Sequence, residues 1–253
     1  MTADYANRRF VLATDLDGTF LGGSEADRRT LYDWIEANRA TVGLVFVSGR
    51  DPEFITELCT GGVPWPEYVI GDVGTTIARV TPDKQIAPIH PLEAEIAAKW
   101  DEAGPAVRDA LADAPGLTLQ PTAFRYRMSY DYDPDAFDPD ARRQIEAMGF
   151  DVLISDNRYF DVLPKGVSKG PSLLRLMGHL HLSRTAVLAA GDTLNDLSML
   201  VAGTPAVAVG GSETPLLEAL PTAPHIYRAS GIGTAGILEA IAHFDLHPTP
   251  ERV

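Results

Sequence analysis

Phe10-Val-Leu-Ala-Thr-Asp15-Leu-Asp17-Gly18-Thr19 is the stretch of sequence that decides the fold of this chain. Its first half is a short apolar run, which is typical of a strand buried on both faces of a parallel sheet. Its second half places two carboxylates and a glycine directly after that strand, where open α/β sheets bind their ligands. Asp and Gly are also common turn residues, so the motif alone does not separate a binding site from an ordinary turn.

The sequence around this motif alternates between strand and helix patterns. Apolar runs predict further buried strands at residues 42–47, 68–70, 186–190 and 206–209. Ser24 and Asp27 have the spacing of a capping box and predict a helix start, and Asp51-Pro52 predicts another. The alternation predicts an α/β fold with a Rossmann-like, doubly wound parallel sheet and helices on both of its faces.

The pattern changes between residues 85 and 163. A helical stretch at 92–112, interrupted at Gly104-Pro105, precedes strands that we expect at 117–120, 124–132, 151–154 and 158–163. We therefore expect a core domain formed by residues 1–84 and 164–253, with a smaller α+β cap domain inserted at 85–163.

Composition excludes some partners. The net charge of −14 argues against nucleic acid, because phosphate backbones are held by Lys and Arg patches. No apolar run approaches the roughly 20 residues that cross a bilayer, and the N-terminal Met1–Arg9 has no apolar signal core. The single cysteine, Cys59, cannot form an internal disulfide, so we expect a cytoplasmic protein. We expect it to act as a monomer or a homodimer.

A second acidic motif, Gly191-Asp192-Thr-Leu-Asn195-Asp196, also follows an apolar run directly. Carboxylates gathered at neighbouring strand ends repel one another by about 4 kcal/mol per pair at 4 Å and an effective dielectric of 20. A divalent cation turns that repulsion into attraction, and Mg²⁺ prefers oxygen ligands. The two motifs together predict a magnesium site.

Two further segments suit a phosphoryl group. Ser48-Gly49-Arg50 ends a predicted strand and offers a hydroxyl and backbone N–H groups ahead of a helix, although a serine there is also an ordinary helix cap. Lys169 opens a predicted helix and could neutralise a phosphoryl group, although most lysines are solvated.

These four segments, in this order, resemble the haloacid dehalogenase superfamily of phosphohydrolases. The resemblance implies that Asp15 is the nucleophile and Asp17 the general acid and base, with Lys169 as the third catalytic residue. It implies a phosphate site at Ser48, Gly49, Arg50, Lys169 and Asn195. It also implies that Mg²⁺ is held by Asp15, Asp17 (through its backbone carbonyl), Asp192 and Asp196.

The inserted cap and the segments at 68–75 and 160–166 are most similar to the group of sucrose-phosphate phosphatases, which includes mannosylfructose-phosphate phosphatase. The resemblance implies hydrolysis of a sugar phosphate, such as sucrose 6-phosphate or mannosylfructose phosphate. The alternatives are a phosphomutase of the phosphomannomutase type and a glucosyl- or mannosyl-phosphoglycerate phosphatase. A catalytically silent sugar-phosphate sensor is disfavoured, because every carboxylate of the motifs is present.

Substrate specificity should come from the cap, because the core motifs address only the phosphoryl group. The segment from Phe124 to Tyr130 alternates with period two, so one strand face would carry Arg125, Arg127 and Ser129. We hypothesise that this face meets the substrate hydroxyls; the alternative is a solvated face over an aromatic core.

Overall fold

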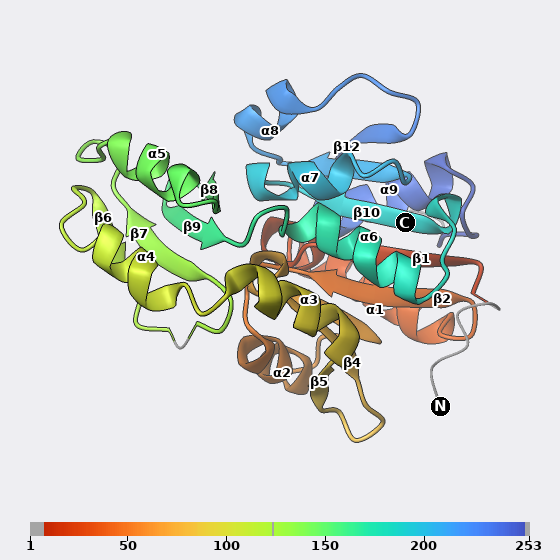
Figure 1. The fold of residues 1–253 in the computed structure, drawn as a ribbon. Coiled ribbons are helices and arrows are strands. Elements are labelled where there is room, and N and C mark those ends of the chain that lie inside the picture. The colour runs from red at the N-terminus through yellow and green to blue at the C-terminus, as the bar shows by residue number, and fades with distance from the viewer. Residues whose placement is uncertain (1–7, 123, 251–253) are drawn as a thin grey trace. The chain divides into compact units, whose positions relative to one another are not determined.

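The computed structural model describes residues 8–122 and 124–250 (Figure 1). It divides into a core unit, Met1–Pro88 with Lys169–Val253, and an inserted unit, Ile89–Ser168. These divisions lie four and five residues beyond the boundaries predicted at 84/85 and 163/164.

The core unit contains an eight-stranded sheet in the order β12-β11-β10-β1-β2-β3-β4-β5. Six neighbouring strands, from β12 to β3, run parallel. The strands are β1 (Phe10–Thr14), β2 (Val42–Val47), β3 (Tyr68–Gly71), β4 (Thr76–Val80), β5 (Ile86–Pro88), β10 (Val187–Gly191), β11 (Ala206–Gly210) and β12 (Ile226–Ile232). The predicted α/β class and parallel core are confirmed.

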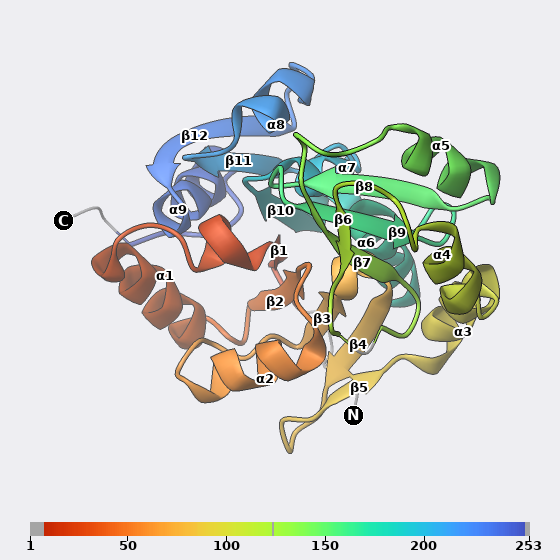
Figure 2. The ribbon, with the colours of Figure 1, turned by 90° about the vertical axis from the view of Figure 1, so that its left-hand side faces the viewer.

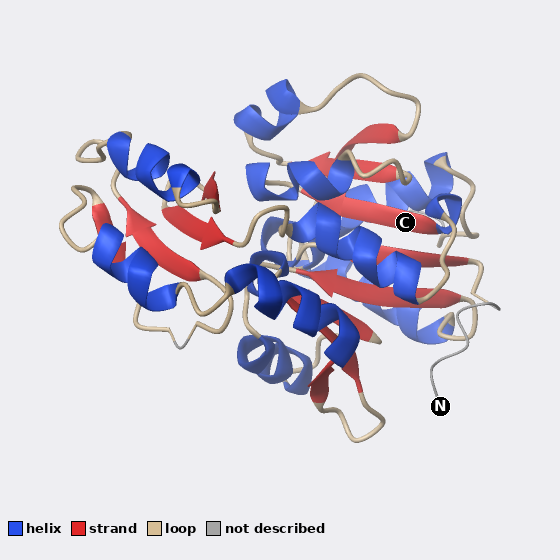
Figure 3. Ribbon diagram, viewed as in Figure 1, coloured by secondary structure: helices blue, strands red, loops and turns tan. Residues whose placement is uncertain are grey.

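Helices cover both faces of this sheet (Figures 2 and 3). They are α1 (Glu25–Ala37), α2 (Pro52–Thr60), α6 (Lys169–His179), α7 (Leu197–Leu200), α8 (Thr214–Ala219) and α9 (Thr234–His243). Alternate strand residues such as Leu12, Leu44 and Phe46 join a cluster with α1, α2 and α9. The helices α6 and α7 lie on the opposite side (Figure 2), so the central strands are buried on both faces, as their unbroken apolar runs predict.

The sheet is mixed at one edge, where the sequence pattern predicted nothing. Strands β4 and β5 pair antiparallel with β3 and with each other. The hairpin turns at Thr81-Pro-Asp-Lys84, where the Thr81 N–H bonds the Gln85 carbonyl at 2.9 Å and Lys84 has a positive φ. Short strands that end in a Pro-Asp turn lack the long apolar run by which the other core strands were recognised.

The inserted unit is an antiparallel sheet of order β6-β7-β9-β8 packed against helices. Met128 and Tyr130 on one strand and Phe160 and Val162 on its neighbour join Trp100 and the helices in one apolar cluster. The elements are α3 (His90–Trp100), α4 (Gly104–Ala110), β6 (Leu117–Leu119), β7 (Met128–Tyr132), α5 (Asp140–Ala147), β8 (Asp151–Ser155) and β9 (Tyr159–Leu163).

The strand predicted at 124–132 is too long. β7 begins only at Met128, so Arg125 and Arg127 precede the strand rather than lie on it. The alternation of polar and aromatic residues matches a strand pattern, but within the described residues no strand pairs with 124–127.

Local signals elsewhere are confirmed. The Ser24 hydroxyl accepts the Asp27 N–H at 3.1 Å and the Asp27 carboxylate accepts the Ser24 N–H at 3.1 Å, which completes the capping box. Asp51 caps α2 by accepting the Phe54 N–H at 2.9 Å. The described residues also form short helical turns, namely η2 (Leu16–Phe20), η3 (Asp72–Gly74), η4 (Arg184–Ala186) and η5 (Leu194–Asp196). Among the described helices, none combines the length and apolarity needed to span a membrane.

Cys59 on α2 provides a test of this packing. Its thiol is buried in the core cluster, and burial raises its pKa to about 12. We expect alkylation by iodoacetamide at pH 8 to be slow in the native protein and fast in denaturant, because the native thiol is both protonated and covered. Mass spectrometry of the labelled protein measures the two rates; equal rates would contradict the packing of α2.

Candidate active site

The site lies where β1, β2 and β10 end. Asp15 follows β1 directly, and its N–H bonds the Ala190 carbonyl of β10 at 2.9 Å, which ties the two strand ends together. Asp15 is only 5% exposed, so its carboxylate is held inside the protein rather than in a solvated turn. The sequence alone did not separate a binding site from an ordinary turn at this motif. The structure shows a turn in which the charged side chain of Asp15 is buried.

Gly18 has a specific steric role in the turn that follows. It has a φ of +79°, and a Cβ atom there would lie 2.2 Å from Oδ2 of Asp192. The next residue, Thr19, is fully buried and donates its hydroxyl to Oδ1 of Asp192 at 2.6 Å. The glycine therefore lets the Asp192 carboxylate approach the first motif, and the threonine fixes its orientation.

Lys169 lies at the centre of the site. Its ammonium group is fully buried and donates to Oδ1 of Asp15 at 2.7 Å, to Oδ1 of Asn195 at 2.7 Å and to Oδ1 of Asp196 at 2.6 Å. These three contacts use the three protons of the ammonium group. The alternative of a solvated surface lysine is excluded by this burial.

Asp196 organises the loop after β10. Its second oxygen, Oδ2, accepts the backbone N–H groups of Asp192 at 3.0 Å and Thr193 at 3.1 Å. A Cβ atom on Gly191 would lie 2.5 Å from the Asp196 side chain, so a glycine is needed for the carboxylate to fold back over the strand end. Asp196 thus holds both the loop and Lys169.

Ser48 lies at the end of β2, which pairs with β1, and is 1% exposed. Its N–H bonds the Ile70 carbonyl at 2.8 Å, and its hydroxyl accepts the Arg50 N–H at 3.1 Å. The cap of α2 is Asp51, so the alternative reading of Ser48 as that helix cap is wrong. Gly49 lies between the two residues in the same loop.

Asp17 is placed differently from Asp15. Its side chain is 55% exposed and receives two hydrogen bonds from Arg50, from Nε at 2.9 Å and from an Nη at 3.1 Å. The Arg50 guanidinium also lies 4.5 Å from the centre of the Phe54 ring. Arg50 therefore holds the Asp17 carboxylate in a defined position at the rim of the site.

Asp15, Asp192 and Asp196 form a cluster in which one oxygen of each lies within 4.8 Å of the others. Burial raises the pKa of Asp15 well above its usual value, and repulsion by Asp196 and Asp192 adds to this against the attraction of Lys169. Burial likewise raises the pKa of Asp192 to about 7. Burial opposes the charge of Lys169, but Asp15 and Asp196 outweigh it and raise the pKa of that ammonium.

This donor set fits a magnesium ion. One ammonium group faces three buried carboxylates, so the cluster has more negative charge than its own cation compensates. All the oxygens are hard ligands of the kind that Mg²⁺ prefers. The Asp17 carboxylate is not a member of the cluster, which agrees with a ligand role for its backbone carbonyl alone.

The three predicted substrate residues of the inserted unit are engaged with carboxylates of that unit. Arg127 and Ser129 are buried, and both bond the Asp161 carboxylate, with an Nη of Arg127 at 3.0 Å from Oδ1. Arg125 makes a two-point ion pair with Glu93. The three residues therefore do not form one solvated strand face, and two of them share a buried ionic network.

Sequence reasoning did not assign a role to Thr19 or Glu213. Thr19 lies within the first motif, so its position was a usable signal. Glu213 accepts the Leu194 N–H at 3.1 Å and donates its own N–H to the Asp192 carbonyl at 2.9 Å. No local pattern marks Glu213, because its partners lie about twenty residues earlier in the chain.

A family model and a solved structure each match almost the whole chain. The profile of the family described as sucrose-6F-phosphate phosphohydrolase matches residues 8–245. A solved sucrose-phosphatase from Synechocystis sp. PCC6803, in complex with sucrose and phosphate, superposes with a TM-score of 0.84 at 24% identity, over 94% of this chain and 98% of that one.

Two relatives match almost all of this chain, but one of them is much longer than the chain. Mannosylfructose-phosphate phosphatase of Agrobacterium fabrum is 27% identical over 249 residues, which cover 94% of this chain and 98% of that protein. A glucosylglycerol-phosphate synthase of Pseudomonas anguilliseptica is 40% identical over 236 residues, which cover 92% of this chain. The chain spans only 30% of the length of that synthase.

The excess of buried negative charge predicts that removal of one carboxylate stabilises the metal-free protein. Without metal, Asp192→Asn should be more stable than the wild type by about 1 kcal/mol or more, because it removes one of three repelling charges and keeps an acceptor for Thr19. Added Mg²⁺ should raise the melting temperature of the wild type and have little effect on Asp192→Asn.

Asp17→Asn is the matched control, because it changes a carboxylate of the same motif outside the cluster and keeps the backbone carbonyl. Its Mg²⁺-dependent rise should persist. Differential scanning fluorimetry with and without chelator measures all three proteins. An undiminished rise in Asp192→Asn would contradict the assignment of the site.

Proposed function

The chain belongs to the sucrose-6F-phosphate phosphohydrolase family, and on that premise we propose that it hydrolyses a sugar phosphate through a phosphoryl group carried by Asp15. The observation that carries the proposal is the fully buried Lys169, which holds the Asp15 carboxylate at 2.7 Å at the end of β1. A nucleophilic carboxylate has to be fixed in position and desolvated, and both conditions are met here.

In the proposed first step, an oxygen of Asp15 attacks phosphorus, and the bond from phosphorus to the sugar oxygen breaks. Asp17 gives a proton to the departing sugar oxygen. In the second step, water attacks the phosphorus of the acyl phosphate and gives a proton to Asp17, which releases inorganic phosphate and restores the Asp15 carboxylate. Asp17 can reach both the leaving oxygen and water because its side chain is 55% exposed, and it can carry the proton once its two-point contact with Arg50 opens.

The remaining residues position the phosphoryl group. The Ser48 hydroxyl, whose oxygen accepts the Arg50 N–H, and the Gly49 N–H would bind its oxygens, with Lys169 offsetting charge on the nucleophile and Asn195 fixing Lys169. Mg²⁺, held by Asp15, Asp192 and the Asp17 carbonyl with support from Asp196, would supply positive charge to the phosphoryl oxygens. We also propose a cytoplasmic location, supported by the lone, buried Cys59.

The names of the relatives narrow the substrate class. Sucrose phosphate, mannosylfructose phosphate and glucosylglycerol phosphate are all phosphorylated glycosides. Among the three relatives named above, the synthase shares the highest identity with this chain, 40%. We therefore place glucosylglycerol phosphate first among the candidate substrates and the two disaccharide phosphates next.

Phosphate release with Mg²⁺ from a panel of sugar phosphates tests the activity. The panel holds glucosylglycerol phosphate, sucrose 6-phosphate, mannosylfructose phosphate, glucosyl phosphoglycerate and simple hexose phosphates. We expect one phosphorylated glycoside to exceed the hexose phosphates, and Asp15→Asn to lower the rate by about a thousandfold or more because it removes the nucleophile.

Asp33→Asn, an exposed carboxylate on α1, serves as the control and should keep full activity. Conversion of a hexose 1-phosphate to a 6-phosphate without phosphate release would contradict a phosphatase and favour a phosphomutase. Full activity in Asp15→Asn would contradict the nucleophile.

Among the three cap residues that the sequence predicts to meet the substrate, we propose that Arg125 recognises the glycoside, because Arg127 and Ser129 are buried against Asp161. Arg125 is the accessible member, since 46% of its side chain is exposed. We expect Arg125→Gln to raise KM for the glycoside phosphate by about tenfold, the value of one hydrogen bond from a charged group, with little change for para-nitrophenyl phosphate.

Arg142→Gln is a matched control in the same unit, because Arg142 is also about half exposed and ion-paired, with Glu146 at 2.8 Å. It should leave both KM values unchanged. Equal losses for the two substrates in Arg125→Gln would indicate a damaged fold instead of lost recognition.

A further inference from the structure

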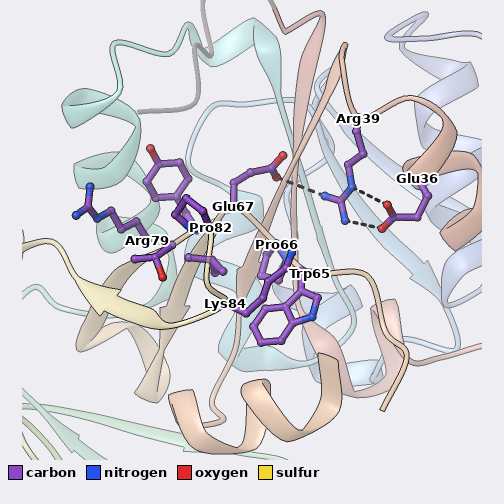
Figure 4. A pocket seen from close by; sticks show the side chains of 11 residues that line it. Glu36, Arg39, Trp65, Pro66, Glu67, Arg79, Pro82 and Lys84 are labelled. Atoms are coloured by element: carbon purple, nitrogen blue, oxygen red, sulfur yellow. Dashed lines mark hydrogen bonds and ion pairs between the residues drawn. The ribbon is translucent and has the colours of Figure 1, made fainter. Parts of the chain in front are cut away.

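A second concave site lies on the core unit, at the other end of β3 from the site described above (Figure 4). It has a volume of about 580 Å³, within the range of small-molecule sites. Glu67 and Tyr68 line it at the amino end of the strand, whereas the carbonyl of Ile70, near the carboxyl end, bonds Ser48. The two sites therefore lie at opposite ends of the strands of the sheet.

Three segments supply the walls of this pocket. The segment after α1 contributes Arg39, the segment before β3 contributes Trp65 and Glu67, and the β4–β5 hairpin contributes Arg79 and Lys84. In Figure 4, Arg79 lies to one side of Glu67 and Arg39 to the other. The pocket thus gathers three cations in a chain whose net charge is −14.

The carboxylates in the pocket are already compensated. Glu67 accepts the Leu44 N–H at 2.8 Å and pairs with Arg8 at 3.2 Å and with Arg39 at 3.6 Å. Glu36 pairs with Arg39 at 2.7 Å. None of these contacts involves the two cations of the β4–β5 hairpin.

Arg79 and Lys84 are those cations. Both side chains are exposed, and within the described part of the chain neither forms an ion pair with a carboxylate. Arg79 lies directly opposite Tyr68 in the strand register. Lys84 is held with its ammonium 5.3 Å from the centre of the Trp65 ring.

An aromatic wall beside two exposed cations suits one kind of ligand. A sugar or base ring can pack against the partly exposed Trp65 and the neighbouring prolines, while an anionic group on that ring accepts hydrogen bonds from Arg79 and Lys84. We propose that this pocket binds a small phosphorylated ring compound, a sugar phosphate or a nucleoside monophosphate, separately from the catalytic site.

Tryptophan fluorescence gives a direct test. The chain has three tryptophans, of which Trp34 and Trp100 are 8% and 4% exposed, so a quenching ligand acts mainly on Trp65. Asp15→Asn protein, which should not hydrolyse the probes, is titrated with AMP and glucose 6-phosphate and with uncharged adenosine and glucose. We expect saturable quenching by at least one phosphorylated probe, absent in Trp65→Phe and weakened by salt. Whichever probe binds identifies the source of the ring.

The double variant Arg79→Gln/Lys84→Gln should weaken this binding by about tenfold or more and leave phosphatase activity unchanged. Arg29→Gln/Arg142→Gln removes two exposed cations elsewhere and should bind as before. The proposal is overturned if no probe gives saturable quenching up to about 10 mM. Equal binding of the uncharged probes, or unchanged affinity in Arg79→Gln/Lys84→Gln, would overturn it as well.

Discussion

The buried ammonium group of Lys169 is the interaction on which the site depends. Removing a charge from water costs several kcal/mol, and only close partners can offset that cost. Lys169 has three of them, Asp15, Asn195 and Asp196, which come from two strand ends far apart in sequence. Lys169 is also the first residue of the core unit after the inserted unit. The return of the chain to the core is thus fixed by the same contacts that orient the proposed nucleophile.

The arrangement around Asp192 shows how steric and electrostatic constraints combine. Gly18 lets that carboxylate approach the first motif, and Thr19 holds it by a hydrogen bond of 2.6 Å. The result is a set of three carboxylates whose mutual repulsion is not fully offset by one lysine. The same repulsion makes the cluster a favourable position for a divalent cation.

Sequence alone was sufficient for the parts of the molecule with strong local signals. The unbroken apolar runs predicted the parallel strands, and the motifs at their ends predicted which side chains would meet, because parallel strands bring their carboxyl ends to one edge. It failed where long-range contacts decide the structure. Arg125 and Arg127 matched a strand pattern without a partner strand, and the β4–β5 hairpin was too short to be recognised. The contacts of Glu213, and the pocket lined by Trp65, Arg79 and Lys84, depend on residues that only folding brings together.

The central claim is that Asp15 carries the phosphoryl group. The most direct measurement is mass spectrometry of peptides from enzyme mixed with a reactive sugar phosphate and quenched in acid within the first turnover. The account predicts a phosphoryl group on the peptide that contains Asp15, with none on the same peptide from Asp15→Asn. A substrate that turns over while no phosphoryl group appears on Asp15, or one that labels another residue, would contradict it.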